Sequence, residues 1–323
     1  MLDLNHIQST PGYDVQQFYG TFSSTTATWQ TWRKPRGINW VYMIGVGGGS
    51  SGGTGVNTGT SSGGGCPGNS GAQSVVMMPA ILLPDVLYIQ PGLGGVGLST
   101  SGALPVAGTT TYVSIEPSTT INGNSTILYA GGAGNSGAVA ATTTAGGTAA
   151  TATVLATQSI MCLGYRTLNN LTGAVQGIAG ASRTSTTGNS QTIATSLSGL
   201  MVSGGAGGGG MNAGTGGNGC FFLVPSGALG QDFVPISGVG ATGAIGSTPA
   251  QRGADGFICK NFLFFVGGQG GGAASATAGG IAGAGGNGSY GCGGGGSGGS
   301  NTTNTTIAKA GDGGPGFVII ISF

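Results

Sequence analysis

Residues 40–53 read WVYMIGVGGGSSGG, so that an apolar run passes directly into a glycine tract. The same arrangement recurs at uneven spacing, as VLYIQPGLGGVG from Val86, TILYAGGAGNSG from Thr126, GLMVSGGAGGGG from Gly199 and FLFFVGGQGGG from Phe262. Short runs rich in β-branched and aromatic residues and bounded by Gly, Pro or Asn are typical of strands. Helical periodicity is nearly absent, and only residues 151–171 leave room for a short helix. The sequence therefore predicts an all-β fold.

The composition is far from that of an average soluble enzyme. Glycine accounts for 75 of 323 residues, whereas Lys and Arg number 8 and Asp and Glu number 7. A glycine held in a strand costs roughly 0.5–1 kcal/mol relative to alanine, because it loses more backbone freedom than any other residue. Dense backbone hydrogen bonding or burial in an oligomer must offset that cost. The apolar runs argue against a disordered chain, and the lack of a strict Gly-X-Y repeat argues against collagen.

The closing run, GFVIIISF at residues 316–323, is too apolar to stand at the edge of a sheet. We expect it to pair inside a sheet, most simply with residues 40–46. Its isoleucines lack in-and-out alternation, which predicts a strand covered on both faces, in a sandwich core or a subunit interface. We therefore expect a β-sandwich-like scaffold over residues 28–323 as a single domain, preceded by a polar N-terminal arm or docking segment at residues 1–27.

The long glycine tracts allow two interpretations. In residues 204–219 and 267–299 a glycine or another tiny residue recurs near every third position. A left-handed polyproline-II helix has about three residues per turn, and bare copies of it can pack side by side with their N–H and C=O groups bonded laterally. Packed polyglycine-II helices are one interpretation, and long ordered irregular loops are the other.

Enzyme chemistry has little support in the sequence. The motifs of serine hydrolases, zinc proteases and P-loop proteins are missing. Five scattered cysteines with a single histidine give no support for a zinc site, and their odd number favours free thiols, with pairing of two of them after release as the alternative. The carboxylates that folding could bring together are Asp85, Glu116, Asp232, Asp255 and Asp312. Asp255 and Asp312 each precede glycine, so we interpret them as turn residues. We predict no catalytic residue and no cofactor.

The charge and hydropathy of the chain limit the kinds of partner that we expect it to bind. A formal net charge of +1 gives no basis for capturing nucleic acid, which requires clustered Lys and Arg. No apolar stretch reaches the roughly 18 residues of a membrane-spanning helix, so membrane insertion is not expected. The first residues, MLDLNHIQSTPG, lack the basic and apolar regions of a secretory signal.

Two stretches resemble a known family. TWQTWRKPRGINWVYMIGVGGGSSGG, from Thr28, resembles the opening of the glycine-rich domain of tail-fibre and related virion proteins of tailed phages, and GDGGPGFVIIISF, from Gly311, resembles its terminal strand. The residues that match as a structural signature are Trp32, Pro35, Gly37, Trp40, Pro315, Gly316 and Phe317. The resemblance implies an all-β scaffold at the surface of the virion, often a homotrimer, in which loops between glycine tracts of adhesin members contact a host receptor.

Two functions follow as hypotheses. A tail-fibre or receptor-binding adhesin needs aromatic anchors near loop tips, for which Tyr112, Tyr165 and Tyr290 are the candidates. A capsid decoration or cement protein, or the subunit of an extracellular glycine-rich filament, would instead bury such groups against neighbours. Both predict a structural protein at the virion surface, made in the host cytoplasm. Its expected partners are copies of itself, other virion proteins held through the N-terminal arm, and a host-surface receptor.

Overall fold

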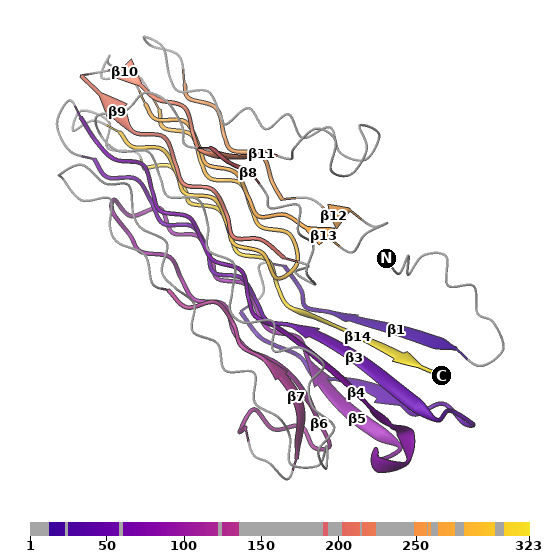
Figure 1. Ribbon diagram of the computed structural model, residues 1–323. Coiled ribbons are helices and arrows are strands. Elements are labelled where there is room, and N and C mark those ends of the chain that lie inside the picture. Colours follow the sequence, from indigo (N-terminus) through magenta and orange to yellow (C-terminus); the bar gives the residue numbers. More distant parts are fainter. Residues whose placement is uncertain are drawn as a thin grey trace.

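The chain combines a β-sandwich with a long stack of glycine-rich segments that extends from one end of it (Figure 1). The computed structural model describes residues 13–22, 25–57, 61–121, 125–135, 190–192, 202–213, 215–223, 249–256, 258–259, 264–274, 281–300 and 307–323. These residues form strands, one short 3-10 turn and no α-helix, which confirms the all-β prediction. Residues 151–171, where a helix had room, lie outside the described part.

The first sheet is antiparallel and has the strand order β1-β14-β3-β4. Its strands are β1 (Asp14–Tyr19), β14 (Phe317–Ser322), β3 (Trp40–Val46) and β4 (Gln73–Pro79). The last strand pairs with the early strand β3 in the register Ile319 to Ile44, so the expected pairing of the two is confirmed. On its other side β14 pairs with β1, which places Asp14 opposite Ser322. Part of the predicted N-terminal arm is therefore an edge strand of this sheet.

The second sheet is also antiparallel, with the order β2-β5-β6-β7. Its strands are β2 (Gln30–Arg33), β5 (Val86–Gln90), β6 (Thr111–Ser114) and β7 (Thr126–Ala130). A 3-10 turn, η1 (Ala80–Leu82), follows β4 and leads toward β5. The register of β6 against β7 shifts between Val113 and Ser114, which marks a bulge near the end of the pair.

The two sheets pack face to face around an apolar core. Trp32, Met43, Met78 and Leu87 are fully buried there, with residues from both sheets in one cluster. Burial of these large side chains supplies the main favourable contribution to folding of the sandwich. Because the signature residue Trp32 lies in this core, its strand β2 packs against the first sheet.

The opposite face of the first sheet is covered as well. Ile319 belongs to a second cluster with Ile44, Val46, Phe265 and Phe317, whereas Ile320 belongs to the core between the sheets. All of β14 is buried. The predicted covering of this strand on both faces is therefore confirmed.

Short strand pairs lie along the glycine-rich part of the chain (Figure 1). They are the antiparallel pair β9 (Met211–Asn212) with β10 (Thr215–Gly216), the parallel pair β8 (Ser190–Thr192) with β11 (Phe221–Leu223), and the antiparallel pair β12 (Ile258–Cys259) with β13 (Phe264–Phe265). The turn between β9 and β10 lies at the end of the molecule opposite the sandwich (Figure 1).

Candidate functional site

The glycine stack is the part of the chain without an ordinary side-chain core. We define it as residues 47–56, 63–72, 92–98, 103–109, 131–135, 202–210, 217–220, 250–256, 266–274, 281–289, 291–300 and 308–316. Several of its segments continue strands of the sandwich without a break, as β3 continues into residues 47–56. The segments run side by side over their length (Figure 1).

Backbone hydrogen bonds in the stack follow a three-residue period. In residues 47–56, each successive N–H points to a different neighbouring segment, and N–H groups three residues apart return to the same one, except that of Gly55, which donates to Ser297 Oγ. The donor–acceptor pairs are Gly47–Ala72, Ser50–Asn69, Gly53–Cys66 and Val56–Gly63 on one side, Gly48–Thr109, Ser51–Val106 and Thr54–Ala103 on a second, and Gly49–Gly314 and Gly52–Gly311 on a third. This arrangement differs from a β-ladder, in which donors alternate between two sides.

Residues 291–300, with the sequence GCGGGGSGGS, lie at the centre of the stack. The N–H groups of residues 293–300 donate to residues 203–209, 50–56 and 283–286, and carbonyls of the segment accept from residues 65–71, 268–274 and 311–314. This segment is therefore hydrogen-bonded to segments on every side, and all of its residues are buried.

The centre of the stack has no room for side chains at most positions. A Cβ atom placed on Gly295 would lie 2.1 Å from the carbonyl oxygen of Gln269, and one on Gly298 would lie 1.9 Å from that of Gly272. Because these obstacles are backbone atoms, no rotamer change of a neighbour could relieve the clash. Glycine is required there to let the segments approach closely.

Where the stack does carry side chains, buried serines accept backbone N–H groups. Ser50 Oγ accepts from the N–H of Asn69 at 2.8 Å, and Ser297 Oγ accepts from the N–H of Gly55 at 3.0 Å. Ser203 Oγ accepts from the N–H of Gly267 at 2.9 Å. These hydroxyls supply acceptors to buried donors, which would be costly to leave without a partner.

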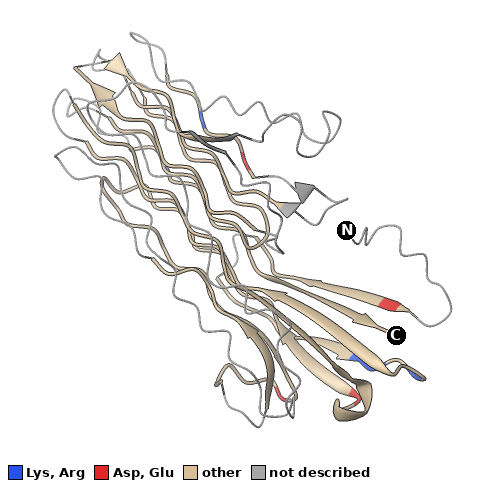
Figure 2. Cartoon of the chain, viewed as in Figure 1, with Lys and Arg blue, Asp and Glu red and all other residues tan. Residues whose placement is uncertain are grey.

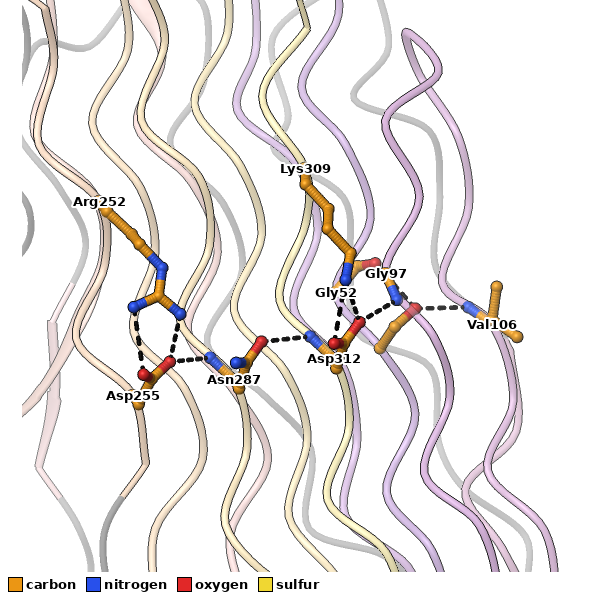
Figure 3. A network of polar contacts seen from close by, with 9 residues as sticks. Gly52, Gly97, Val106, Arg252, Asp255, Asn287, Lys309 and Asp312 are labelled. Atoms are coloured by element: carbon orange, nitrogen blue, oxygen red, sulfur yellow. Dashed lines mark hydrogen bonds and ion pairs between the residues drawn. The ribbon is translucent and has the colours of Figure 1, made fainter. Parts of the chain in front are cut away.

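One outer face of the stack carries a row of polar side chains that crosses several segments (Figure 3). Asp255 Oδ1 accepts from the N–H of Asn287 at 2.6 Å, Asn287 Oδ1 accepts from the N–H of Asp312 at 2.9 Å, and Asp312 Oδ1 accepts from the N–H of Gly97 at 2.7 Å. We call this set the capping row. Each link joins a side chain of one segment to the backbone of another, so the row ties the outer segments together.

Two ion pairs support the capping row. Arg252 donates to Asp255 Oδ2 at 3.1 Å, and Lys309 donates to Asp312 Oδ2 at 3.0 Å. In each pair the partners are three residues apart, which matches the three-residue period of the backbone hydrogen bonds. Charged residues are otherwise sparse over the drawn molecule (Figure 2). Sequence reasoning missed Arg252, Asn287 and Lys309, although the spacing of opposite charges could have indicated Arg252 and Lys309.

Asp255 and Asp312 were expected to be turn residues, and here the structure differs. Both lie inside segments of the stack, where their carboxylates accept backbone N–H groups of a neighbour. Of the other candidate carboxylates, Asp85 forms a surface ion pair with Lys34 at 3.3 Å, and Asp232 lies outside the described residues. Within the described ranges, no group of three or more His, Cys, Asp or Glu could hold a metal ion.

The signature residues lie where the sandwich meets its turns. Trp32 is fully buried in β2, and Gly37 has a positive φ of 80°, a backbone conformation that favours glycine. Gly316 joins the stack to β14, since its N–H donates to the carbonyl of Gly92 at 2.8 Å. Phe317 is fully buried, and Trp40 pairs with Pro79 across β3 and β4. Pro35 is half-buried and Pro315 is buried.

The three candidate tyrosines are not brought together. Tyr112 is half-buried on β6, opposite Tyr129 of β7, and Tyr165 lies outside the described residues. Tyr290 is half-buried, and its ring centroid lies 4.6 Å from that of Tyr19 and 4.8 Å from that of Phe22. Burial, and then the neighbouring Tyr290, raise the pKa of the Tyr19 hydroxyl. Tyr290 therefore packs at the junction of sandwich and stack, and its role in receptor contact stays a prediction.

Three cysteines are buried as free thiols: Cys66, Cys220 and Cys292. Burial raises the pKa of the Cys66 thiol from 9.0 to about 11 and that of the Cys292 thiol to about 12. The thiolate is the reactive form of cysteine, so Cys66 and Cys292 are chemically quiet at neutral pH. The thiols at Cys162 and Cys259 lie outside the side chains that the structure describes.

No protein-family model matches the chain, and no curated protein matches it. Among the described residues, the structure also contains no helix that is long and apolar enough to cross a membrane.

Proposed function

We propose that this chain is a structural protein of the virion surface, most simply a homotrimeric tail-fibre or receptor-binding adhesin of a bacteriophage, without enzymatic activity. In this proposal the sandwich faces the particle and the glycine stack projects away from it. Residues 1–27 contact other virion proteins, with β1 tying this arm to the first sheet.

The placement of β1 and β14 carries the proposal. β14 leads away from the stack, from Phe317 to Ser322, and Asp14 at the start of β1 lies opposite Ser322. β1 thus begins, and β14 ends, at the end of the sandwich that is remote from the stack, while β9 and β10 lie at the other extreme (Figure 1). A protein attached at one end and presenting turns at the other suits a tip that meets a host surface.

We further propose that the stack is a lattice of polyglycine-II helices. The three directions of hydrogen bonding from residues 47–56, and the bonding of residues 291–300 on every side, support this proposal. Such a lattice would hold the distal turns on a rigid support with almost no side-chain core, and rigid support of binding loops reduces the entropy lost on binding.

The receptor-contact surface would lie at the distal turns. The hydrogen bond from the N–H of Gly102 to the carbonyl of Gly55 and the bridge between Ser62 and Met211 bring separate chain reversals to one end. The residues around these reversals are uncharged, which favours a receptor read by hydrogen bonds and apolar contacts. Of the tyrosines expected as receptor contacts, Tyr112 lies on β6 of the sandwich and Tyr290 at the junction of sandwich and stack, so neither belongs to these turns, and Tyr165 lies outside the described residues.

Two experiments test the proposal. Gold-labelled antibody against the chain should decorate the tail tip of intact particles, whereas capsid labelling would favour a decoration or cement protein and labelled fibrils an extracellular filament. Purified chain should also block adsorption of the phage to its host. A folding-defective variant, Ile319→Asp with Ile320→Asp, serves as control, and no difference between the two proteins would contradict the adhesin function.

A further inference from the structure

The capping row occupies backbone donors that point out of the stack. In residues 281–289, the N–H of Gly286 donates to Gln269 and the N–H of Gly288 donates to Asp312, both within the stack. The N–H of Asn287 between them must point in a third direction, because successive donors turn by about one third of a circle. No backbone carbonyl of the stack accepts it; the carboxylate Oδ1 of Asp255, on the adjacent segment, accepts it at 2.6 Å.

The next outer segment repeats this geometry. In residues 308–316, the N–H groups of Gly313 and Gly314 donate to Gly95 and Cys292. The N–H of Asp312 points in the third direction, where Asn287 Oδ1 accepts it at 2.9 Å. An N–H three residues later would point in the same direction, but residue 315 is a proline and has no N–H.

A third outer segment completes the pattern. In residues 92–98, the N–H of Gly95 donates to the carbonyl of Gly49, and the N–H of Leu93 donates to Thr109 Oγ1 at 2.7 Å. The N–H of Gly97 takes the remaining direction, and Asp312 Oδ1 accepts it at 2.7 Å. Three outer segments thus have an outward donor closed by a side chain of the adjacent segment.

The capping row and its two ion-pair partners, Arg252 and Lys309, also occupy space at the surface. The side chains of Arg252, Asp255 and Lys309 are 49%, 50% and 50% exposed, so they cover the face that a further glycine segment would need to approach. In the interior of the stack, by contrast, even a single Cβ at Gly295 would collide with a neighbouring backbone. Bulk and charge on this face are therefore incompatible with adding another segment.

We infer that the capping row is an edge-protection device that prevents a glycine segment of a second copy of this chain from adding to the stack. The open side of a laterally hydrogen-bonded stack resembles the edge of a β-sheet, whose unpaired donors and acceptors recruit further chains unless charges or bulk block them. Here the side chains accept one outward donor in each of three segments and also occupy the face. The inference concerns association between copies and is independent of what the distal turns bind.

The first test removes the side chains of the capping row and of its ion-pair partners and leaves the backbone in place. A variant with Arg252, Asp255, Asn287, Lys309 and Asp312 all changed to glycine should form larger assemblies as its concentration rises, beyond the size of the wild-type protein in sedimentation velocity. The matched variant with the same five residues changed to alanine keeps the Cβ atoms on this face, so it should stay at the wild-type size. Equal sizes for folded wild-type and glycine-substituted protein would overturn the inference.

The second test uses the wild-type protein, so it decides the matter even if the glycine variant does not fold. Amide exchange at Asn287, Asp312 and Gly97 should be slowed on the order of 100-fold relative to an unstructured chain, because each donor is bonded. In the variant Asp312→Asn, which keeps an acceptor oxygen without the charge, the Gly97 amide should stay protected. Exchange of these three amides at the unstructured rate in the wild-type protein would refute the capping.

Discussion

Ile319 and Ile320 are consecutive residues of β14 whose fully buried side chains lie on opposite faces of one sheet, in two separate apolar clusters. One cluster is the core between the two sheets, and the other joins the sheet to Phe265 and Cys292 near the glycine stack. A single strand thus packs against both the core of the sandwich and the adjoining end of the stack. Substitutions in β14 should therefore destabilise both the sandwich and the stack.

The variant Ile319→Asp with Ile320→Asp should not fold. An uncompensated buried charge costs about 3–5 kcal/mol, and two such charges would exceed or consume most of a typical net stability of about 5–15 kcal/mol. Circular dichroism and solubility of the purified variant measure the effect. The matched control is Ile81→Asp, because Ile81 is 89% exposed and its substitution should change stability by less than about 0.5 kcal/mol. A soluble double variant with a wild-type spectrum would show that β14 is not enclosed.

Gly295→Ala tests the close approach of segments in the stack. The added methyl would meet the carbonyl oxygen of Gln269, and the expected loss of stability is at or above the upper end of the roughly 1–3 kcal/mol typical of overpacking. Gly37→Ala is the comparison, since its Cβ would meet no atom within 4 Å and only its positive φ, worth about 1–2 kcal/mol, opposes it. Denaturant unfolding of both variants compares them, and a harmless Gly295→Ala would contradict the packing.

The buried thiols predict a loss of stability at alkaline pH. Since burial raises the pKa of Cys66 to about 11 and of Cys292 to about 12, the folded protein keeps these protons where the unfolded chain, with thiol values near 9.0, releases them. Stability should therefore fall as pH rises above about 9, and the loss should continue until the folded thiols titrate. Unfolding midpoints at pH 8 and 10 measure it. The variant Cys66→Ala with Cys292→Ala should show a smaller drop, and an equal drop would count against this cause.

The thiols should also be silent toward a disulfide reagent at pH 8 in the native protein and react fully in denaturant. Cys66 and Cys292 are enclosed by the stack, so their reaction requires it to open. Rapid reaction of both thiols under native conditions would show that the stack admits solvent.

The oligomeric state is a separate prediction. We expect a homotrimer because the resemblance to phage virion domains implies trimers; the apolar strands themselves give no reason for one, since β14 is already buried on both faces within a single chain. Sedimentation equilibrium of the purified chain should give three times the monomer mass. A stable monomer would remove the oligomer from the proposal and leave the fold unaffected.

Much of the sandwich could be predicted from its apolar runs. The pairing of β14 with β3 and the covering of Ile319 and Ile320 followed from a strand too apolar for an edge. The role of Asp14–Tyr19 as an edge strand was missed, because its polar sequence carries no strong strand signal and its partner lies at the other end of the chain.

The arrangement of the stack was much harder to predict. Bare glycine carries no side-chain pattern, so nothing in residues 291–300 indicates which segments surround it. The outer segments do hold a usable signal. Larger residues recur every third position in residues 281–290, as Ile281, Ala284, Asn287 and Tyr290, and these residues are exposed or half-buried, whereas most of those between them are buried. A three-residue period of substituents thus marks a segment at the surface of the stack.

Amide hydrogen exchange over residues 291–300 tests the central claim most directly. If this segment is bonded on every side as described, its amides should exchange as slowly as those of β14, in the most protected class of the protein. Exchange at the rate of an unstructured peptide, while β14 stays protected, would mean that the glycine segments are a tether and not a stack.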